Sequence, residues 1–293
     1  MNWWRNLRGK VKFQEPLRNR ATFKIGGPAK FFIEPKDIVD LKLLIVLAKR
    51  YKIPIFVIGR GSNILISDKG LKGIVVYLNS PFFKRISIKP NSLEVSSGLA
   101  LRQLVEVAKE RGLSGMEFLA GIPGTVGGAL IMNAGSGAKF IGDLVREVKV
   151  MDYNGNIRIL SKKNIKFGYR KSSLKKFIIL SACLKVTKKN KAEINNNLKR
   201  YLGYRRNTQD ISLPNAGCIF KNPSKEPAGK LIDLCGLKGR KIGDACISQI
   251  HANFILNKGN ARSSDVLKLM DLVKKKVKNK FNITLEPEIK IWR

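Results

Sequence analysis

The segment "GIPGTVGGALIMNAG", residues 121–135, is the most unusual part of the chain and constrains the fold most. Glycine recurs there among small and apolar residues, which lets a backbone approach a ligand closely and turn its N–H groups toward phosphate or carbonyl oxygens. The alternative is a glycine-rich loop or barrel corner that is packed for space alone. We expect a loop at 121–135, and the rest of the sequence must decide its purpose.

Length and composition favour a folded chain outside the membrane. With 293 residues and 44% hydrophobic content, the chain can form about two or three packed domains. The amino terminus is basic but shows no apolar segment followed by a cleavage site. The longest apolar stretch, "LLIVLA" at 43–48, is too short to span a bilayer. We expect a cytoplasmic monomer without membrane insertion.

The formal net charge of +36 would attract phosphates on nucleic acid, on a membrane surface or on a small ligand. The lysines run through every segment, however, and no zinc-finger or aromatic RNA-binding signature is present. The densest patch, "VKKKVKNK" at 273–280, keeps Val273 and Val277 at helical spacing, as a solvated helix face does. We therefore favour a lysine-rich proteome over nucleic-acid binding as the source of the charge.

Metal binding has little support. The four cysteines show no C-x-x-C spacing, and the chain has a single histidine. A multi-histidine metal site is therefore excluded, as is any Ser-His triad that does not use His251. We expect no metal.

The first third of the chain alternates strand and helix patterns. Residues 30–35 and 53–59 are typical of strands, and Asp37 can cap a helix between them. After Gly59 the sequence returns to short apolar runs punctuated by glycine, with no helix behind them. This pattern excludes the usual dinucleotide fold, which needs G-x-G-x-x-G followed by a helix.

The remaining two thirds mix both kinds of element. A helix from Leu101 closed by Gly112 follows a strand, and Asn154-Gly155 between β-forming runs predicts a hairpin. The later predictions are helices at 191–206, 229–236 and 264–280, the last capped by Ser263 or Ser264, and strands at 251–257 and 284–292.

Taken in order, the motifs resemble a known family. They are "ATFKIGGPAKFF" (21–32), "IGRGSNILISD" (58–68), "GIPGTVGGALIMNAG", "FGYRKSS" (167–173), "GCIFKNP" (217–223), "IHANFILN" (250–257) and "LEPEIKI" (285–291). This order is similar to that of UDP-N-acetylenolpyruvoylglucosamine reductases, and the resemblance covers essentially the whole chain.

The resemblance implies an α+β fold: an FAD-binding part of the p-cresol methylhydroxylase and vanillyl-alcohol oxidase type, followed by a C-terminal α+β substrate domain. The implied boundaries are 1–78 and 79–188 for two FAD-binding subdomains and 189–284 for the substrate domain, with strand 285–293 returning to the first subdomain.

The family's reaction uses NADPH and non-covalent FAD to reduce the enolpyruvyl ether of a UDP-amino sugar, giving UDP-N-acetylmuramate for peptidoglycan. No separate nicotinamide fingerprint is visible, which suits alternating use of one pocket by NADPH and substrate. Only residues 171–176 separate Arg170 from the next strand, so we expect the form without the tyrosine-bearing insertion.

Two stretches are expected to hold FAD. The glycines, Ser62 and Asn63 of "GRGSN" would cradle the pyrophosphate, with Arg60 facing either the phosphates or solvent. The resemblance places the 121–135 segment along the other side of the cofactor. The expected cofactor-binding residues are Gly59, Arg60, Gly61, Ser62, Asn63, Ile122, Pro123, Gly124, Thr125, Gly127, Gly128 and Ala129.

Two of the three expected catalytic residues are charged. Hydride delivery leaves negative charge on the substrate's carboxylate and adjacent carbon, and Arg170 offers a planar, permanently charged donor for it. Glu286 and Glu288 share one face of a predicted strand, so spacing cannot choose between them. The resemblance favours Glu288.

The third expected catalytic residue is Cys218, the proton donor, where many relatives carry serine. A free thiol has a reference pKa near ~8.5 and releases a proton far more readily than an alcohol, so the change should preserve the reaction. A buried structural cysteine is the alternative. Lys221 and Asn222 are expected to reach the sugar or diphosphate, and His251 to contact substrate.

Two rival functions remain open. One is an FAD-dependent oxidase or dehydrogenase acting on another small substrate, although no matching histidine or tyrosine base is apparent. The other is a basic nucleic-acid-binding protein that uses a degenerate flavin fold.

Overall fold

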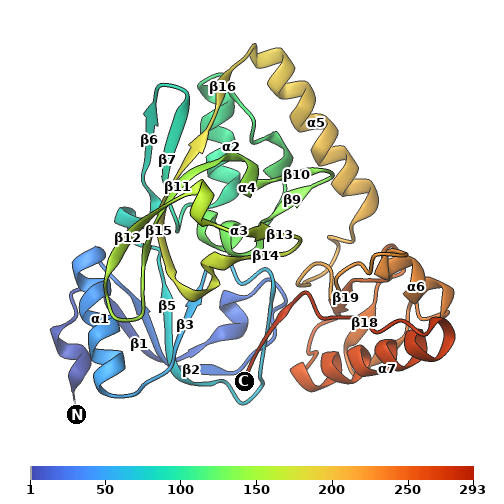
Figure 1. Cartoon of the computed structure of the whole chain (residues 1–293). Coiled ribbons are helices and arrows are strands. Elements are labelled where there is room, and N and C mark those ends of the chain that lie inside the picture. The colour runs from blue at the N-terminus through green and yellow to red at the C-terminus, as the bar shows by residue number, and fades with distance from the viewer. Residues whose placement is uncertain (1) are drawn as a thin grey trace. The chain divides into compact units, whose positions relative to one another are not determined.

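The computed structural model describes residues 2–293, which divide into two compact units. Unit 1 comprises Met1–Phe13, Phe31–Arg60 and Gly73–Arg205, and unit 2 comprises Gln14–Lys30, Gly61–Lys72 and Arg206–Arg293. The chain can be followed through both by its colour in Figure 1. The subdomain boundaries expected at residues 78, 188 and 284 stay predictions.

A four-stranded sheet carries the first part of the chain, in the order β1 (Lys10–Pro16), β2 (Pro28–Glu34), β5 (Leu71–Tyr77) and β3 (Ile55–Ile58). Helix α1 (Ile38–Arg50) begins as predicted, because the Asp37 carboxylate accepts the Asp40 N–H at 2.9 Å. Its apolar face is buried in a core shared with Phe31 and Ile74.

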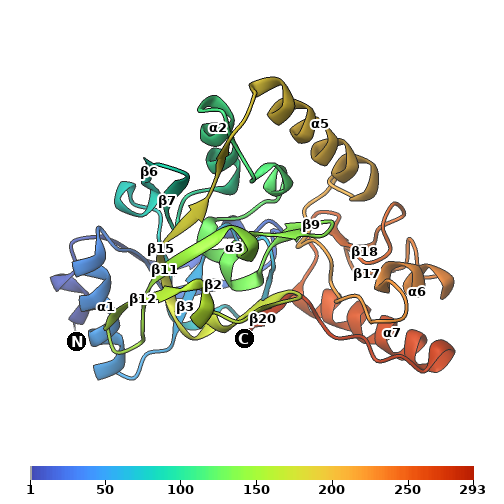
Figure 2. The same ribbon diagram turned by 45° about the horizontal axis from the view of Figure 1, so that its top comes forward.

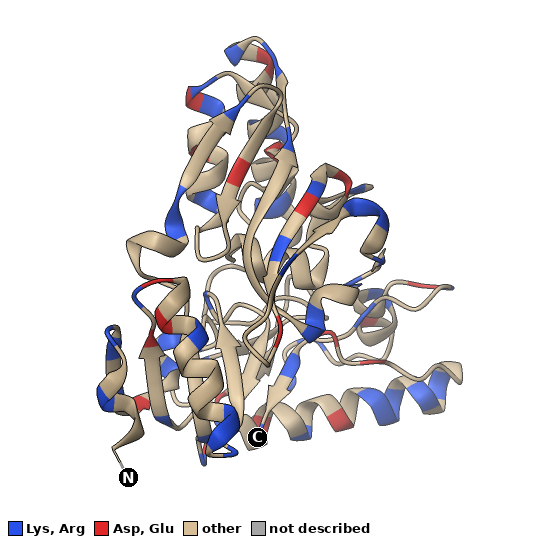
Figure 3. Ribbon diagram, turned by 60° about the vertical axis from the view of Figure 1, so that its left-hand side comes forward, with Lys and Arg blue, Asp and Glu red and all other residues tan. Residues whose placement is uncertain are grey.

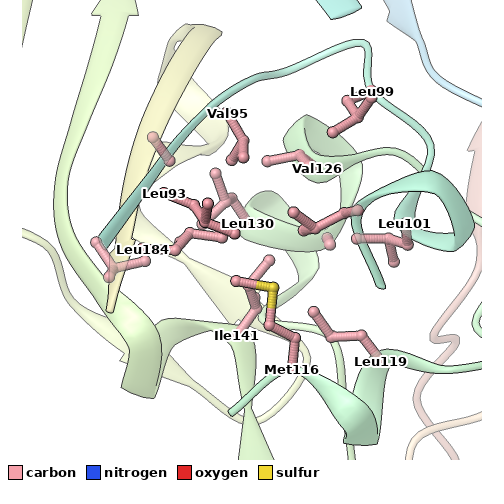
Figure 4. Packing of buried hydrophobic residues seen from close by; sticks show 14 of the residues in the cluster. Leu93, Val95, Leu99, Leu101, Met116, Leu119, Val126, Leu130, Ile141 and Leu184 are labelled. Atoms are coloured by element: carbon pink, nitrogen blue, oxygen red, sulfur yellow. The ribbon is translucent and has the colours of Figure 1, made fainter. Parts of the chain in front are cut away.

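A five-stranded antiparallel sheet forms the centre of unit 1, in the order β12 (Ile157–Ser161), β11 (Val145–Met151), β15 (Ile178–Lys185), β7 (Ser92–Ser96) and β6 (Ile86–Lys89). The predicted hairpin lies between β11 and β12, with Gly155 at φ +85°. Helix α2 (Leu101–Glu110) is closed, as predicted, by Gly112, which lies two residues beyond its end at φ +65°. Figure 4 shows Leu93, Leu184 and Leu130 packing together in this core.

The loop expected at 121–135 is wrong, because the segment contains helix α3 (Val126–Met132). Thr125 caps it by accepting the Gly128 N–H at 3.3 Å, and Asn133 ends it at φ +46°. Val126 and Leu130 lie four residues apart and are fully buried (Figure 4). Burial of that apolar face outweighs the poor helix propensity of the glycines.

The core of unit 2 lies between helices and a small sheet. Helices α6 (Ala228–Leu234) and α7 (Ser263–Phe281) pack with strands β17 (Lys241–Ile242), β18 (Ala245–Ile247) and β19 (Ile255–Asn257), as Figures 1 and 2 show. Helix α7 contributes Val266, Leu269, Val273 and Val277 to this core. The spacing confirms the helical interpretation of the lysine-rich segment.

Two predicted strands are shorter than expected. The strand at 251–257 reduces to β19, and the one at 284–292 reduces to β20 (Lys290–Trp292), which pairs in parallel with β4 (Ile64–Ile66). Before β20 only an isolated bridge forms, between Phe220 and Pro287. Proline has no N–H for a strand ladder, which explains the interruption.

The predicted serine cap of α7 is also wrong. The N-cap position is Arg262, whose N–H is accepted by the Asp265 carboxylate at 2.9 Å. The Asp68 carboxylate accepts the Ser263 N–H and hydroxyl, both at 2.8 Å, and the Ser264 N–H at 3.3 Å. A charged acceptor at a helix amino terminus bonds more strongly than a serine hydroxyl.

Short elements complete the description. They are η1 (Trp3–Asn6), η2 (Leu17–Arg20), η3 (Pro81–Lys84), β8 (Leu113–Ser114), η4 (Glu117–Leu119), β9 (Gly135–Ser136), β10 (Lys139–Phe140), α4 (Ile141–Leu144), η5 (Lys162–Asn164), β13 (Phe167–Gly168), β14 (Lys171–Ser172), η6 (Ser173–Lys176), β16 (Thr187–Lys188) and α5 (Lys191–Thr208).

The charge is spread over helices and strands alike (Figure 3). Within residues 2–293, no helix is long and apolar enough to cross a membrane.

The Asp68 cap gives a stability prediction. Asp68→Ala leaves N–H groups in the first turn of α7 without their acceptor, so the free energy of unfolding should fall by about 1–2 kcal/mol. Chemical denaturation measures this. Asp271→Ala, which removes an exposed carboxylate 3.7 Å from Lys274, is the control and should change stability by less than about 0.5 kcal/mol. Equal effects of the two substitutions would contradict the assignment.

Candidate active site

In unit 1 the two predicted cofactor stretches meet at Gly59 and Thr125. A Cβ atom built on Gly59, just beyond β3, would lie 2.6 Å from Thr125 Oγ1. Only glycine therefore fits at position 59. Arg60 follows it with an exposed side chain.

The start of α3 separates residues that pack from residues that remain accessible. Thr125, Gly127 and Ala129 are buried, and the N–H groups of Val126 and Gly127 donate to Leu99 O and Ser97 O. The expectation that this segment turns its N–H groups toward a ligand therefore fails at these two residues, because neighbouring carbonyls accept them.

The accessible residues of the same segment are Pro123 and Gly128, which are exposed, with Ile122 and Gly124 half-buried. A Cβ on Gly128 would meet only Thr125 Oγ1, at 3.6 Å, so the space beside Gly128 is open. A bare backbone surface beside the Gly59–Thr125 contact fits the close approach of a cofactor.

The other half of "GRGSN" belongs to unit 2. Gly61 has φ +62°, and a Cβ there would lie 2.4 Å from Arg20 O. Asn63 donates from its amide to Glu288 O at 3.4 Å, and Asn63 O accepts the Lys290 N–H at 2.9 Å. Ser62 is half-buried. The predicted phosphate-binding residues thus lie beside the segment that carries Glu288.

Arg170 occupies the turn between β13 and β14 and has φ +54°. This left-handed conformation costs a residue with a Cβ roughly 1–2 kcal/mol. The guanidinium lies over the Tyr169 ring, 5.5 Å from its centroid. Strained backbone of this kind concentrates at functional sites, where the surroundings hold it in place.

Two hydrogen bonds fasten the Arg170 hairpin to the carboxyl end of α3. Asn133 Nδ2 donates to Gly168 O at 3.2 Å, and Ser172 Oγ donates to Ile131 O at 3.0 Å. Helix α3 has seven residues and is therefore about 10 Å long. One short rigid helix thus carries the predicted cofactor surface at its start and holds the Arg170 turn at its end.

In unit 2 the backbone brings the segments of Cys218 and Glu288 together. Glu288 N–H donates to Ile219 O at 2.8 Å, and Lys221 N–H donates to Glu286 O at 2.9 Å. Cys218 itself is half-buried and forms an isolated bridge with Phe254. Residues 218–221 therefore lie between the 253–254 and 286–288 segments.

Burial separates the two glutamates that the sequence could not distinguish. The Glu286 side chain is 72% exposed, and its carboxylate accepts from Lys221 Nζ at 2.9 Å. Glu288 is only 9% exposed. Burial thus distinguishes the two glutamates, and the catalytic role of Glu288 stays a prediction.

The three expected substrate contacts have roles within the fold. Lys221 forms the ion pair with Glu286, and Asn222 Oδ1 accepts the Ala228 N–H at the start of α6, at 3.1 Å. His251 is half-buried, its ring centroid 4.8 Å from that of Phe254. None of these contacts tests a role in substrate binding, so the substrate roles of the three residues stay predictions.

His251 has a defined tautomer. Its Nδ1 accepts the Asn253 N–H at 3.2 Å, so the neutral ring carries its proton on Nε2. Burial lowers the pKa of His251, which a backbone hydrogen bond partly opposes and the charge of Lys238 reinforces. The imidazole is therefore a neutral Nε2–H donor at neutral pH.

Sequence reasoning missed the buried polar residues that hold these segments. Asp210, 3% exposed, accepts from the Ser248 hydroxyl at 2.6 Å, and Ser248 Oγ accepts the His251 N–H at 3.1 Å. Asn253 bonds to the backbone of Phe220. The one available signal was a polar residue inside the apolar run "HANFILN".

Comparisons with known proteins agree with these observations. Residues 209–292 match the family model of the UDP-N-acetylenolpyruvoylglucosamine reductase C-terminal domain, and residues 29–161 match that of an FAD binding domain. UDP-N-acetylenolpyruvoylglucosamine reductases of Caldanaerobacter subterraneus and Anoxybacillus flavithermus are each 41% identical, over 97% of this chain and 94% of theirs.

Solved structures point the same way. The UDP-N-acetylenolpyruvylglucosamine reductase of Thermus caldophilus has a TM-score of 0.84 and 35% identity, covering 98% of this chain and 100% of its own. A solvent-stable cholesterol oxidase has a TM-score of 0.52 and 12% identity, over 62% of this chain and 39% of its own, which shows a shared fold only. These matches confirm the α+β fold with an FAD-binding part. The chain belongs to the UDP-N-acetylenolpyruvoylglucosamine reductase family.

Proposed function

We propose that this chain uses NADPH and non-covalently bound FAD to reduce UDP-N-acetylglucosamine enolpyruvate to UDP-N-acetylmuramate, a peptidoglycan precursor, with Cys218 as the proton donor. The observation that carries the proposal is the backbone pairing that joins the segment of Cys218 to that of the buried Glu288. Membership of the reductase family supports the reaction. We also propose that the protein acts as a monomer in the cytoplasm.

The surface at Gly59, Gly124 and Gly128 is the part of unit 1 that we propose holds FAD. Gly61, Ser62 and Asn63, which belong to unit 2, stay predicted cofactor-binding residues. When bound, FAD carries the hydride from NADPH to the terminal carbon of the enolpyruvyl ether. The bare backbone at these glycines lets the flavin nucleotide approach without meeting side chains. The remaining members of the predicted set, Thr125, Gly127 and Ala129, support this surface from inside.

Arg170 is proposed to stabilise the negative charge that develops on the substrate. Addition of hydride places charge on the adjacent carbon and the carboxylate, and a guanidinium matches that planar group with paired N–H donors. The strained turn fixes Arg170 before the reaction, so little reorganisation is needed when the charge appears.

Cys218 is proposed to complete the reaction by giving its proton to the adjacent carbon. The C–H bond forms as the S–H bond breaks, and the thiolate is reprotonated before the next turnover. Glu288, buried beside this segment, would orient the acid or hydrogen-bond the enolate. His251 would donate from Nε2 to substrate, and Lys221 and Asn222 would contact the sugar or diphosphate.

The thiol gives the most direct kinetic prediction. In anaerobic stopped-flow experiments, Cys218→Ala should slow reoxidation of reduced flavin by the enolpyruvyl substrate by about 10²–10⁴-fold, the range expected for loss of a general acid. Cys218→Ser should slow it less. Reduction of flavin by NADPH should not change, because that step needs no proton from Cys218.

Iodoacetamide provides the matched control for this prediction. It should inactivate the wild-type protein and spare Cys218→Ser, which lacks the reactive thiolate. A Cys218→Ala protein that reoxidises at the wild-type rate would exclude the thiol as the acid.

Arg170 gives a paired prediction for stability and rate. Arg170→Gly and Arg170→Ala both remove the guanidinium, so both should slow reoxidation by about 100-fold or more. Only the alanine keeps a Cβ at φ +54°. The glycine variant should therefore be more stable by roughly 1 kcal/mol in chemical denaturation. Equal stability of the two variants would argue against the strained turn.

Gly59 tests the cofactor surface. Gly59→Ala forces a Cβ against Thr125 Oγ1, so we expect lower stability and a smaller ratio of bound flavin to protein in the absorption spectrum. Gly203→Ala in α5, where an added Cβ meets no atom within 4 Å, is the control. It should keep its flavin and gain about 0.5–1 kcal/mol. Normal flavin content in Gly59→Ala would remove Gly59 from the site.

A further inference from the structure

Asn253 is a buried polar residue for which the reaction requires no direct role. Its relative exposure is 1%, and a buried carboxamide is tolerated only when its donor and acceptor groups are satisfied. The carboxamide oxygen and nitrogen both bond to the backbone of Phe220. Phe220 N–H donates to Asn253 Oδ1 at 2.9 Å, and Asn253 Nδ2 donates to Phe220 O at 2.8 Å. The side chain thus acts as a neighbouring strand would.

The main chain of Asn253 also serves the segments with site residues. Its carbonyl accepts the Ile219 N–H at 2.9 Å, and its N–H donates to His251 Nδ1 at 3.2 Å. One residue therefore fixes the backbone immediately after Cys218 and sets the tautomer of His251.

The opposite edge of the same backbone is equally occupied. Ile219 O accepts the Glu288 N–H at 2.8 Å, and Lys221 N–H donates to Glu286 O at 2.9 Å. Residues 219–221 are thus held between Asn253 on one side and 286–288 on the other. Loss of the Asn253 carboxamide would remove both partners of Phe220 on this edge and leave only the Ile219 N–H bonded there, so the segment could move relative to Glu288.

We propose that Asn253 is a positioning residue for proton transfer: its carboxamide holds the backbone of residues 219–220, and so keeps Cys218 in place beside the segment of Glu288. The proposal rests on the proposed function of Cys218. Displacement of a reacting group by about 1 Å can reduce a rate on the order of 100-fold. Loss of the carboxamide should have an effect of that size.

The test compares two buried asparagines. Asn253→Leu removes both side-chain hydrogen bonds and keeps the branched shape of the side chain. Asn257→Leu is the matched control, because Asn257 is 2% exposed and its carboxamide bonds to Phe23 O at 3.0 Å and to the Gly259 N–H at 2.9 Å. Both variants should lower the thermal midpoint, so a general loss of stability is common to the pair.

The first readout separates the two half-reactions by anaerobic stopped flow. Asn253→Leu should slow flavin reoxidation by the enolpyruvyl substrate about 100-fold and leave flavin reduction by NADPH unchanged. Asn257→Leu should change neither rate. Equal slowing of both half-reactions, or the same kinetic defect in Asn257→Leu, would reduce Asn253 to a structural role.

The second readout does not depend on catalysis. The rate of alkylation by iodoacetamide is measured at each thiol by mass spectrometry. Compared with wild type, Asn253→Leu should change this rate several-fold at Cys218 and leave it constant at the half-buried Cys235. If wild-type protein lacks reductase activity but Cys218 shows this change, the proposed function and the role in proton transfer fail, and only the placement of Cys218 by Asn253 stands. If folded Asn253→Leu alters neither Cys218 reactivity nor reoxidation, the positioning role is wrong.

A smaller side chain keeps the test decisive if the leucine protein does not fold. Asn253→Ala removes both side-chain hydrogen bonds to Phe220 and adds no volume at this buried position. It should show the same selective slowing of reoxidation. Wild-type reoxidation and wild-type Cys218 alkylation in Asn253→Ala would contradict the proposal.

Discussion

The chemistry proposed for unit 2 depends on one constraint: the backbone of residues 219–221, directly after Cys218, is hydrogen-bonded on both edges. Hydrogen bonds from Asn253 satisfy one edge of residues 219–220, and bonds with Glu286 and Glu288 satisfy the other. A strand occupied on both edges cannot slide without leaving buried polar groups unpaired, which is costly. Regular β structure is nevertheless minimal here, because Pro287 interrupts the ladder. Side-chain amides replace the missing strand neighbours.

In unit 1, helix α3 fixes the predicted site residues. The helix packs its apolar face into the core shown in Figure 4, and its two ends support different parts of the proposed site. Its start supports the glycine surface suited to a cofactor, and its end holds the strained Arg170 turn through Asn133 and Ser172. A change in the packing of α3 would therefore disturb both the proposed cofactor surface and the position of the Arg170 guanidinium.

Local patterns in the sequence predicted much of the fold. The Asp37 cap of α1 and the hairpin at Gly155 depend on residues close in sequence, and both are confirmed. Helix α3 escaped prediction because burial overrides the propensity of its glycines. The α7 cap escaped because its acceptor, Asp68, lies 195 residues away in the sequence.

For the candidate site, too, local motifs could be predicted from the sequence and contacts distant in sequence could not. The motifs located the segments of Cys218 and Glu288, but alternation along a strand could not separate Glu286 from Glu288. The ion pair with Lys221 and the burial of Glu288 make that distinction, and both arise from tertiary packing. The network of Asp210, Ser248 and Asn253 carries no motif of its own. The net charge of +36 finds no explanation in the contacts of the site.

The pH dependence of flavin reoxidation tests the central claim, that the transferred proton comes from the Cys218 thiol. A thiol ionises at far lower pH than an alcohol, so the wild-type rate should fall at alkaline pH as the thiol is converted to thiolate. In Cys218→Ser that alkaline fall should disappear, leaving a slower rate that is flat over the same range. An identical alkaline limb in both proteins would show that another group supplies the proton.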